Sequence, residues 1–334
     1  MTSKDKYILV TGGLGYIGSH TVIELIKNGY KKIVIIDNLS NSKYKTLNII
    51  KKITKRKIHF FKKDIRDKSI NHIFKRFKIN CVIHFAGLKS INESNKRYNL
   101  YFNNNVLGSL NLFKIMDDFK CKKIIFSSSA NVYDNLSKAP YNENNPVKPS
   151  SNYGLTKVMI ENFLEIYSKR NKNNWKVIIL RYFNPIGAHP SGLLNENIKK
   201  AENIIPKLTK VLLKKDKKFF IWGNDYNTKD GTCLRDYVHV SDLANCHIKA
   251  LNIIDRIKHQ IINIGTGKAY SVKDLIKVFS KVMKRKIPYS VGKRRIGDVP
   301  INYADISKSK KILKKNKYKN LIEMVKNIKE TIRI

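Results

Sequence analysis

The chain has 334 residues, of which 42% are hydrophobic, so it is long enough to bury a large core and disorder is not expected. Its 67 Lys and Arg outnumber 25 Asp and Glu, which gives a formal net charge of +42. The cations are spread along the chain with many Asn and Ile residues, as an AT-biased genome would produce. We therefore do not expect nucleic-acid binding.

The first expected element is a buried strand over residues 7–10. Glycines at positions 12, 15 and 18 then open a helix that ends at Gly29. Such glycines let backbone N–H groups approach a pyrophosphate at the positive end of a helix. A second strand, 32–37, ends in Asp37, about 20 residues further on, where a dinucleotide fold places a carboxylate for the ribose hydroxyls. Asn38 follows instead of Arg, which favours NAD over NADP.

Strands and helices alternate along the rest of the first half. Helices are expected over 42–55 and 69–77, and strands over 58–61, 81–85, 124–127 and 177–181. This alternation predicts an α/β fold with a doubly wound parallel sheet of the Rossmann type. Asp64 and Ile65 follow the third strand, where a ligand of such a sheet would meet them.

The pattern changes after Pro185. The second half is expected to be a smaller α+β substrate domain, because its loops at 187–192 and 223–235 are rich in Gly, Asn, Asp and His. We therefore expect a Rossmann domain over residues 1–184 and a substrate domain over 185–334. Segments within about 234–265 are expected to return to the Rossmann domain.

Two helices are apolar on more than one face. One contains Val106, Leu107 and Phe113, and the other contains Leu155 and Phe163. A helix that only covers a sheet needs one apolar stripe. The extra stripes are consistent with a four-helix bundle across a dimer axis, and deeper burial in a monomer explains them almost as well.

Tyr153 and Lys157 open a helix and lie four residues apart, so both project from one face. A neighbouring ammonium, helped by the positive nicotinamide ring of a bound cofactor, favours the phenolate, and we expect it to lower the pKa of Tyr153 and make this residue a base near neutral pH. The fifth strand ends in Ser127, Ser128 and Ser129, and a serine there can relay the proton of a reacting hydroxyl.

Seven segments carry a resemblance to a known family: 11–18, 36–42, 84–89, 126–130, 153–157, 181–185 and 235–239. They closely resemble the UDP-glucose 4-epimerase subfamily of the extended short-chain dehydrogenases/reductases, and the resemblance covers nearly the whole chain. It implies an isomerase that interconverts UDP-galactose and UDP-glucose through a 4-keto sugar with tightly held NAD, and that forms a homodimer.

The resemblance also implies roles for individual residues. The catalytic residues would be Tyr153 as the base, Lys157 on the nicotinamide ribose and Ser129 in the proton relay. Together with Tyr153 and Lys157, the NAD site would contain Gly12, Gly15, Tyr16, Ile17, Gly18, Asp37, Asn38, Asn41, Ser42, Asp64, Ile65, Phe85, Ala86, Gly87, Lys89, Asn104, Ser127 and Tyr182. The UDP-sugar site would contain Lys89, Ser129, Tyr153, Asn184, Asn203, Arg235, Arg295, Asp298 and Asn302. No metal is expected.

The sequence departs from the family pattern at several positions. Asn131 and Asp134 stand where Thr and Gly are usual, and Ile296 stands where an acid is usual. Asn302 occupies the position that gates N-acetylated sugars, and it is smaller than the Tyr of strict glucose/galactose enzymes. We therefore expect some activity on UDP-N-acetylglucosamine.

Two alternatives remain open at this point. A nucleotide-sugar 4,6-dehydratase would need an extra acid and base after Ser129, where the chain has Ala130 and Asn131. A non-catalytic NAD- or nucleotide-sugar-binding protein would be expected to lack Tyr153, Lys157 or Ser129.

The spacing of the cysteines and the lengths of the apolar runs predict the cellular compartment. Four cysteines without paired spacing are expected to be free thiols in a reducing environment. No signal peptide or apolar run of membrane-spanning length is seen, so we expect a cytoplasmic protein that binds no membrane.

Overall fold

The computed structural model describes residues 4–169, 174–197, 203–295 and 298–332. Its centre is a seven-stranded sheet with the strand order β10-β6-β5-β4-β1-β2-β3, in which every pairing is parallel. The strands are β1 (Tyr7–Thr11), β2 (Ile33–Ile36), β3 (His59–Phe61), β4 (Ile79–His84), β5 (Lys123–Ser129), β6 (Lys176–Tyr182) and β10 (His259–Ile264).

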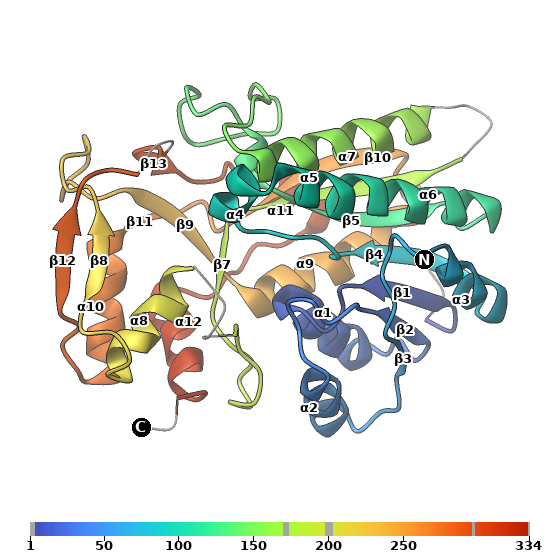
Figure 1. The fold of residues 1–334 in the computed structure, drawn as a ribbon, viewed down its shortest axis with the longest axis horizontal. Helices are drawn as coiled ribbons and strands as arrows, with labels where there is room; N and C mark the ends of the chain where they lie inside the picture. The colour runs from blue at the N-terminus through green and yellow to red at the C-terminus, as the bar shows by residue number, and fades with distance from the viewer. Residues whose placement is uncertain (1–3, 170–173, 198–202, 296–297, 333–334) are drawn as a thin grey trace.

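Helices cover both faces of this sheet, as Figure 1 shows. One face carries α1 (Tyr16–Lys27), α2 (Lys45–Thr54) and α9 (Val240–Ile253), and the other carries α3 (Asn71–Arg76), α6 (Gly108–Asp118) and α7 (Asn152–Lys169). Ile8 and Val10 pack into the first layer and Leu9 into the second, because side chains alternate along a strand. Both faces are therefore apolar, as a parallel sheet requires.

Short helical segments connect the larger elements. They are η1 (Lys68–Ile70), α4 (Ile91–Lys96), α5 (Tyr98–Tyr101), the π-helical η2 (Phe102–Leu107), η3 (Ala130–Val132) and η4 (Ile254–Arg256). α5, η2 and α6 run on from one another, so the π-helical turns lie inside one longer helix. Such turns occur frequently at functional sites.

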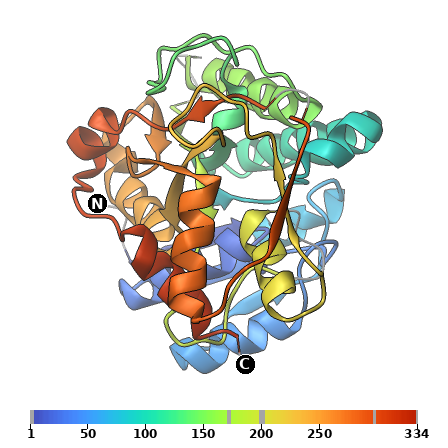
Figure 2. The ribbon, with the colours of Figure 1, turned by 90° about the vertical axis from the view of Figure 1, so that its left-hand side faces the viewer.

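A second lobe has its own apolar core, which includes Leu208, Phe279 and Met324. It is built from α8 (Ile204–Leu212), β8 (Phe219–Trp222), β11 (Ala269–Ser271), α10 (Val272–Met283), β12 (Tyr289–Gly292) and α12 (Leu321–Lys329). Figure 2 views the molecule from this side, with α10 at the front.

Three short strands lie where the two lobes meet: β7 (Asn184–Ile186), β9 (Leu234–His239) and β13 (Ile301–Asn302). Both β7 and β13 pair with β9. α11 (Ser307–Leu313) then returns to the sheet, where it contacts β10 and α9. The buried Asp236 on β9 accepts hydrogen bonds from the amides of Thr266, Gly267 and Ala304, so one carboxylate ties three segments together.

The predicted α/β class with a doubly wound parallel sheet is confirmed. β10 joins the sheet beside β6, and α9 packs on α1, so the chain returns to the first lobe after building part of the second. The division at residues 184 and 185 stays a prediction. One local prediction was wrong, because Arg235 lies on β9 and not in the preceding loop.

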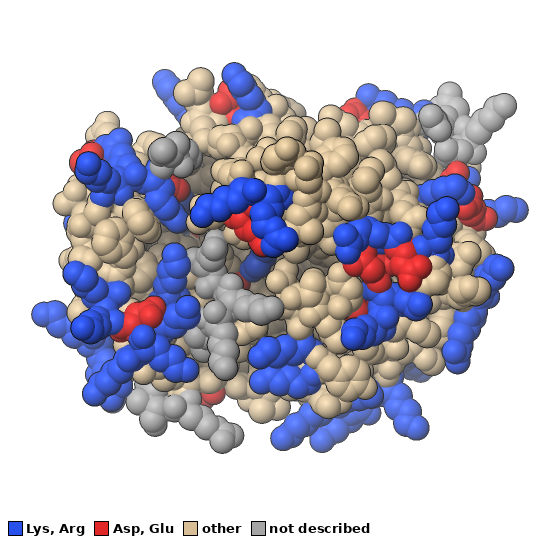
Figure 3. Space-filling model, in the orientation of Figure 1, with Lys and Arg blue, Asp and Glu red and all other residues tan. Residues whose placement is uncertain are grey.

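The cationic side chains follow the expected distribution on the face that Figure 3 shows. Lys and Arg are spread over both lobes and gather in no single stripe there. None of the helices within the described ranges combines the length and the apolar character needed to cross a membrane.

Candidate active site

The turn between β1 and α1 brings three chain segments into backbone contact. A Cβ on Gly12 would lie 2.7 Å from the amide nitrogen of Ala86, in the loop after β4, and a Cβ on Gly18 would lie 2.3 Å from the carbonyl oxygen of Gly12. Gly15 caps α1 without a side-chain hydrogen bond, and the first turn holds no acidic residue. The positive end of α1 is therefore left to an external anion, which fits the pyrophosphate of a dinucleotide.

Asp37 lies immediately after β2 and closes the same turn. Its carboxylate accepts hydrogen bonds from the Leu14 amide at 3.0 Å, the Leu39 amide at 2.9 Å and the Ser42 hydroxyl at 2.7 Å. The acid predicted from spacing thus lies at the glycine turn, while Asn41 nearby is exposed. This position fits a carboxylate that meets the ribose of a dinucleotide.

Asn38 and Asp64, predicted to lie near the adenosine, contact each other. The Asn38 amide donates to Asp64 Oδ2 at 2.7 Å, and the Arg66 guanidinium donates to both carboxylate oxygens of Asp64, at 2.8 and 2.9 Å. Arg66 holds the pKa of Asp64 well below its usual value. The sequence reasoning missed Arg66, although its position two residues after Asp64 made the pairing visible.

The loop after β4 contains Phe85, Ala86 and Gly87, and a buried amide fixes its shape. Asn105 Oδ1 accepts from the Leu88 amide at 2.8 Å, and Asn105 Nδ2 donates to the Leu88 carbonyl at 3.0 Å. The adjacent Asn104, which was predicted, donates to Asn105 Oδ1 at 2.9 Å. Both asparagines lie in the π-helical η2, and Asn105 is a site residue that the sequence reasoning missed.

The three predicted catalytic residues lie together at the carboxyl end of β5. The Lys157 ammonium donates to the Ser127 carbonyl at 2.8 Å and lies 5.8 Å from the centre of the Tyr153 ring. Ser129 forms a hydrogen bond with the Tyr153 phenol. All three side chains are buried, so each of their interactions acts in a poorly screened environment.

The expected lowering of the Tyr153 pKa was wrong for the chain alone. Burial raises the pKa of Tyr153 to about 12, and the hydrogen bond with Ser129 opposes this only in part. Burial also lowers the pKa of Lys157 to about 8, against the raising effect of Glu161. Desolvation thus outweighs the neighbouring ammonium, and a further positive charge is needed to favour the phenolate.

A buried ion pair lies behind the serines. Arg181 on β6 donates to both carboxylate oxygens of Glu161 on α7, at 2.6 and 3.1 Å, and the Ser128 hydroxyl donates to Glu161 at 2.5 Å. Glu161 lies four residues after Lys157, so the pair joins the helix that carries Tyr153 and Lys157 to the strand beside it. Removing one partner would leave the other charge buried and unpaired.

Several of the predicted substrate residues come together where β9 and β13 pair. Arg235 is aligned with Asn302, its guanidinium donates to the Val299 carbonyl at 2.8 Å, and it contacts Asp298 at 3.4 Å. Arg295 donates to the other oxygen of Asp298 at 2.8 Å. Two guanidinium groups thus share one carboxylate, while Asn184 on β7 donates to the Asp236 carbonyl.

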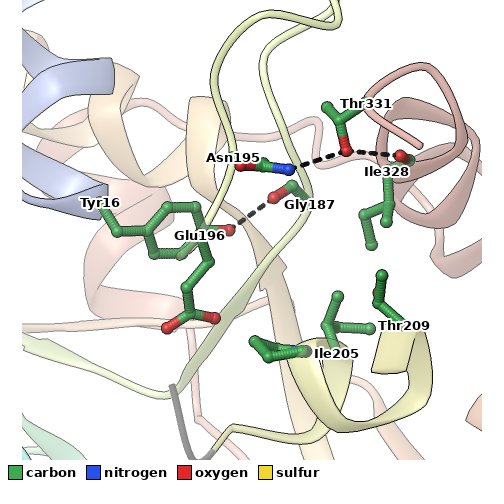
Figure 4. A pocket seen from close by; sticks show the side chains of 9 residues that line it. Tyr16, Gly187, Asn195, Glu196, Ile205, Thr209, Ile328 and Thr331 are labelled. Atoms are coloured by element: carbon green, nitrogen blue, oxygen red, sulfur yellow. Dashed lines mark hydrogen bonds between the residues drawn. The ribbon is translucent and has the colours of Figure 1, made fainter. Parts of the chain in front are cut away.

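Lys89 and Asn203 meet at a residue that was not predicted. The Lys89 ammonium donates to Glu196 Oε1 at 2.7 Å, and the Asn203 amide donates to the same oxygen at 2.6 Å. Glu196 lies beside Tyr16 in a small pocket between α1 and the second lobe, which Figure 4 shows. The Tyr16 hydroxyl donates to the Gly187 carbonyl at 2.7 Å.

Further predicted residues lie on or beside the elements at this edge of the sheet, and their roles stay predictions. Tyr16 and Ile17 form the first turn of α1, Ile65 is buried beside Gly108, and Tyr182 at the end of β6 donates to His247 at 2.5 Å. Of the positions that depart from the family pattern, Asn131 donates to the Ser129 hydroxyl at 3.0 Å, and Ile296 lies outside the described residues.

Comparisons with known proteins agree with this geometry. Residues 8–265 match the NAD dependent epimerase/dehydratase family. The chain is 45% identical to UDP-glucose 4-epimerase of Dictyostelium discoideum over 92% of its own length and 90% of the relative's. It is 43% identical to UDP-glucose 4-epimerase of Bacillus subtilis, with 95% and 94% covered.

A solved structure also matches the whole fold. The UDP-glucose 4-epimerase of Bifidobacterium longum, in complex with NAD+ and UDP, superposes with a TM-score of 0.92 at 38% identity, and the match covers 98% of each chain.

The burial of Lys157 predicts a pH dependence of stability. Its folded pKa of about 8 lies below the usual value of 10.5, so between these limits the unfolded state binds more protons and stability rises with pH. Lys157→Met removes this effect. Urea titrations give the unfolding free energy of each protein. The value for the unsubstituted protein minus that for Lys157→Met should increase by about 2 kcal/mol between pH 7.5 and pH 9.5. A difference that stays constant with pH would contradict a lowered pKa of Lys157 in the folded protein.

Proposed function

Because the chain belongs to the NAD dependent epimerase/dehydratase family, we propose that it is a UDP-glucose 4-epimerase, an isomerase that interconverts UDP-galactose and UDP-glucose with bound NAD. The observation that carries the proposal is the grouping of Tyr153, Lys157 and Ser129 at the carboxyl end of β5, in the same sheet that carries the glycine turn. An NAD-dependent oxidation of a sugar hydroxyl needs a base and a dinucleotide site side by side.

In the proposed reaction, Tyr153 takes the proton of the sugar 4-hydroxyl, and Ser129 donates and accepts hydrogen bonds along the path of that proton. Bound NAD would supply a reversible hydride acceptor for C4 and a positive nicotinamide ring whose charge would favour the phenolate. Lys157 holds the nicotinamide ribose and adds to that charge. The 4-keto sugar turns over between the two transfers, so the hydride returns to the opposite face of C4 while the proton returns to the 4-oxygen.

The dinucleotide would be held by residues from four loops at one edge of the sheet. We propose that Gly12, Gly15 and Gly18 face the pyrophosphate, that Asp37 and Asn38 bind the adenosine ribose, and that Asp64 and Ile65 meet the adenine. The remaining contacts would come from Tyr16, Ile17, Asn41, Ser42, Phe85, Ala86, Gly87, Lys89, Asn104, Ser127 and Tyr182. The uncapped start of α1 supports this arrangement.

The UDP-sugar would lie toward the second lobe, near Asn184, Asn203, Arg235, Arg295, Asp298 and Asn302. Arg235 and Arg295 suit a diphosphate, because a guanidinium can form two parallel bonds to phosphate oxygens. Phe220 and Trp222 on β8 pack against each other in a tilted arrangement with their ring centroids 4.6 Å apart, and both are partly exposed, so they offer an aromatic surface to the uracil ring.

The dehydratase alternative is less consistent with the site. Elimination of water after the C4 oxidation needs an acid and a base beyond Ser129, and the next two residues are Ala130 and Asn131. Asn131 donates to the Ser129 hydroxyl and cannot act as a carboxylate. The non-catalytic alternative has no support either, since the base, the lysine and the serine are all in contact.

The direct test uses the purified protein with UDP-galactose and no added cofactor. UDP-glucose should form, and NAD should be released when the protein is denatured. In Tyr153→Phe, turnover should fall by about 100-fold or more, because the variant lacks the base. NAD should still be released from this variant. Unchanged turnover in Tyr153→Phe would rule out the proposed base, and 4-keto-6-deoxy products would favour the dehydratase.

We also propose that the site accepts UDP-N-acetylglucosamine, because Asn302 leaves more room than a Tyr would. Asn302→Tyr should reduce kcat/KM for the acetylated sugar by about tenfold or more and change that for UDP-galactose much less. Parallel assays measure kcat/KM for UDP-N-acetylglucosamine and for UDP-galactose in both proteins. No turnover of the acetylated sugar by the original protein would contradict the proposal.

An apolar surface on α5, η2 and α7 supports the proposed homodimer. Leu107, Leu155 and Ile166 are between 45% and 49% exposed, and Tyr98 is 60% exposed. Figure 3 shows a broad area with few charged side chains where α5 and α7 lie in Figure 1. Two such surfaces could pack as a four-helix bundle about a two-fold axis.

Light scattering should therefore give twice the chain mass of 38.7 kDa, and Leu155→Asp together with Ile166→Asp should give one chain mass. A monomeric original protein would refute the dimer.

We further propose a cytoplasmic location, which is consistent with four buried free cysteines. Recovery of the protein from another cell fraction would contradict it.

A further inference from the structure

Glu196 is a buried carboxylate whose two described hydrogen-bond partners are both predicted site residues. Its side chain is 8% exposed, whereas that of Lys89 is 57% exposed and reaches inward with its ammonium at 2.7 Å. Asn203 donates to the same carboxylate oxygen. A buried charge is costly without a partner, so Glu196 holds the tip of an otherwise solvated lysine in place.

The ion pair joins the loop after β4 to a second loop, which packs on α1 and leads into the second lobe. Lys89 lies in the loop after β4, which touches the glycine turn where Ala86 packs against Gly12. Glu196 lies in the loop between β7 and α8. The ion pair therefore connects the Rossmann side of the dinucleotide site to the second lobe.

A second connection reaches the same loop from the other side of the turn. Tyr16, in the first turn of α1, donates to the Gly187 carbonyl at 2.7 Å. The charge of Glu196 contributes to raising the pKa of Tyr16, after burial, and the two side chains lie close together in Figure 4. Residues 187–197 of the β7–α8 loop are thus attached both to α1 and to the loop after β4, which meet at the glycine turn.

We infer that Glu196 is a positioning residue that holds Lys89 across the two lobes and thereby slows the release of bound NAD. This inference rests on the proposed function, because it needs a dinucleotide at the glycine turn. We expect release of the dinucleotide to move the loop after β4, which packs against the glycine turn, away from Glu196. That separation breaks the ion pair and leaves Glu196 without its cation. The pair therefore adds to the barrier for release and takes no part in the chemical step.

The experiment measures the rate of NAD release from the purified, NAD-loaded protein by ultrafiltration over time. Glu196→Gln keeps an oxygen for Asn203 and removes the charge, so release should become roughly tenfold faster. Lys89→Met should show the same increase, and the double variant should be no faster than either single variant. Lys89→Arg, which keeps the charge, should retain NAD.

A matched control separates the site from a general effect of losing an ion pair. Asp118→Asn breaks the exposed Lys114–Asp118 pair on α6 and should leave the release rate unchanged. With saturating NAD in the assay, Glu196→Gln should recover most of its turnover, because its defect lies in retention.

Each other outcome has a defined meaning. If the original protein holds NAD and Glu196→Gln releases it no faster, the inference is wrong and the proposed function stands. If Glu196→Gln loses NAD but Lys89→Met does not, Glu196 acts by another route and the inference is also wrong. If the original protein contains no NAD, the proposed function itself fails.

Discussion

The close backbone packing at the glycine turn is the constraint on which the site depends. Gly12 touches the loop after β4, and Gly18 touches Gly12, at distances that leave no space for a side chain. This packing lets β1, α1 and the β4 loop meet at one point. Asp37 then reaches the Leu14 amide, and Asn105 holds the β4 loop against α7 through Thr156. The helix that carries Tyr153 and Lys157 is thus positioned relative to the glycine turn by contacts that begin at Gly12 and Gly18.

Desolvation is the second factor that shapes the site. The first turns of α7 bury a phenol and an ammonium together, and burial disfavours the charged form of each. Glu161 opposes this effect on Lys157, and Arg181 in turn compensates Glu161. A chain of alternating charges therefore runs from the base into the interior. Such an environment makes the phenolate depend on the charge of the bound cofactor, which couples proton removal to the presence of an oxidant.

Residues that act through local spacing could be predicted from the sequence, and those that act through distant contacts could not. The glycines, Asp37, Tyr153 and Lys157 follow one another at distances that strands and helices fix. Glu196 meets Lys89 across 107 positions, and no local pattern marks that pairing. The direction of the Tyr153 pKa shift was also missed, because it depends on burial, which a helix pattern does not show. The parallel sheet was predictable since every strand is an apolar run.

The return of the chain to the first lobe has a consequence for synthesis on the ribosome. β10 forms the edge of the seven-stranded sheet and α9 covers α1, yet both are translated after residue 239. Until then, the nascent chain exposes the apolar side of α1 and an unpaired edge of β6. Such surfaces bind chaperones or aggregate. The protein is therefore expected to fold late as one unit, and a chain cut between its lobes would not give two independent folded halves.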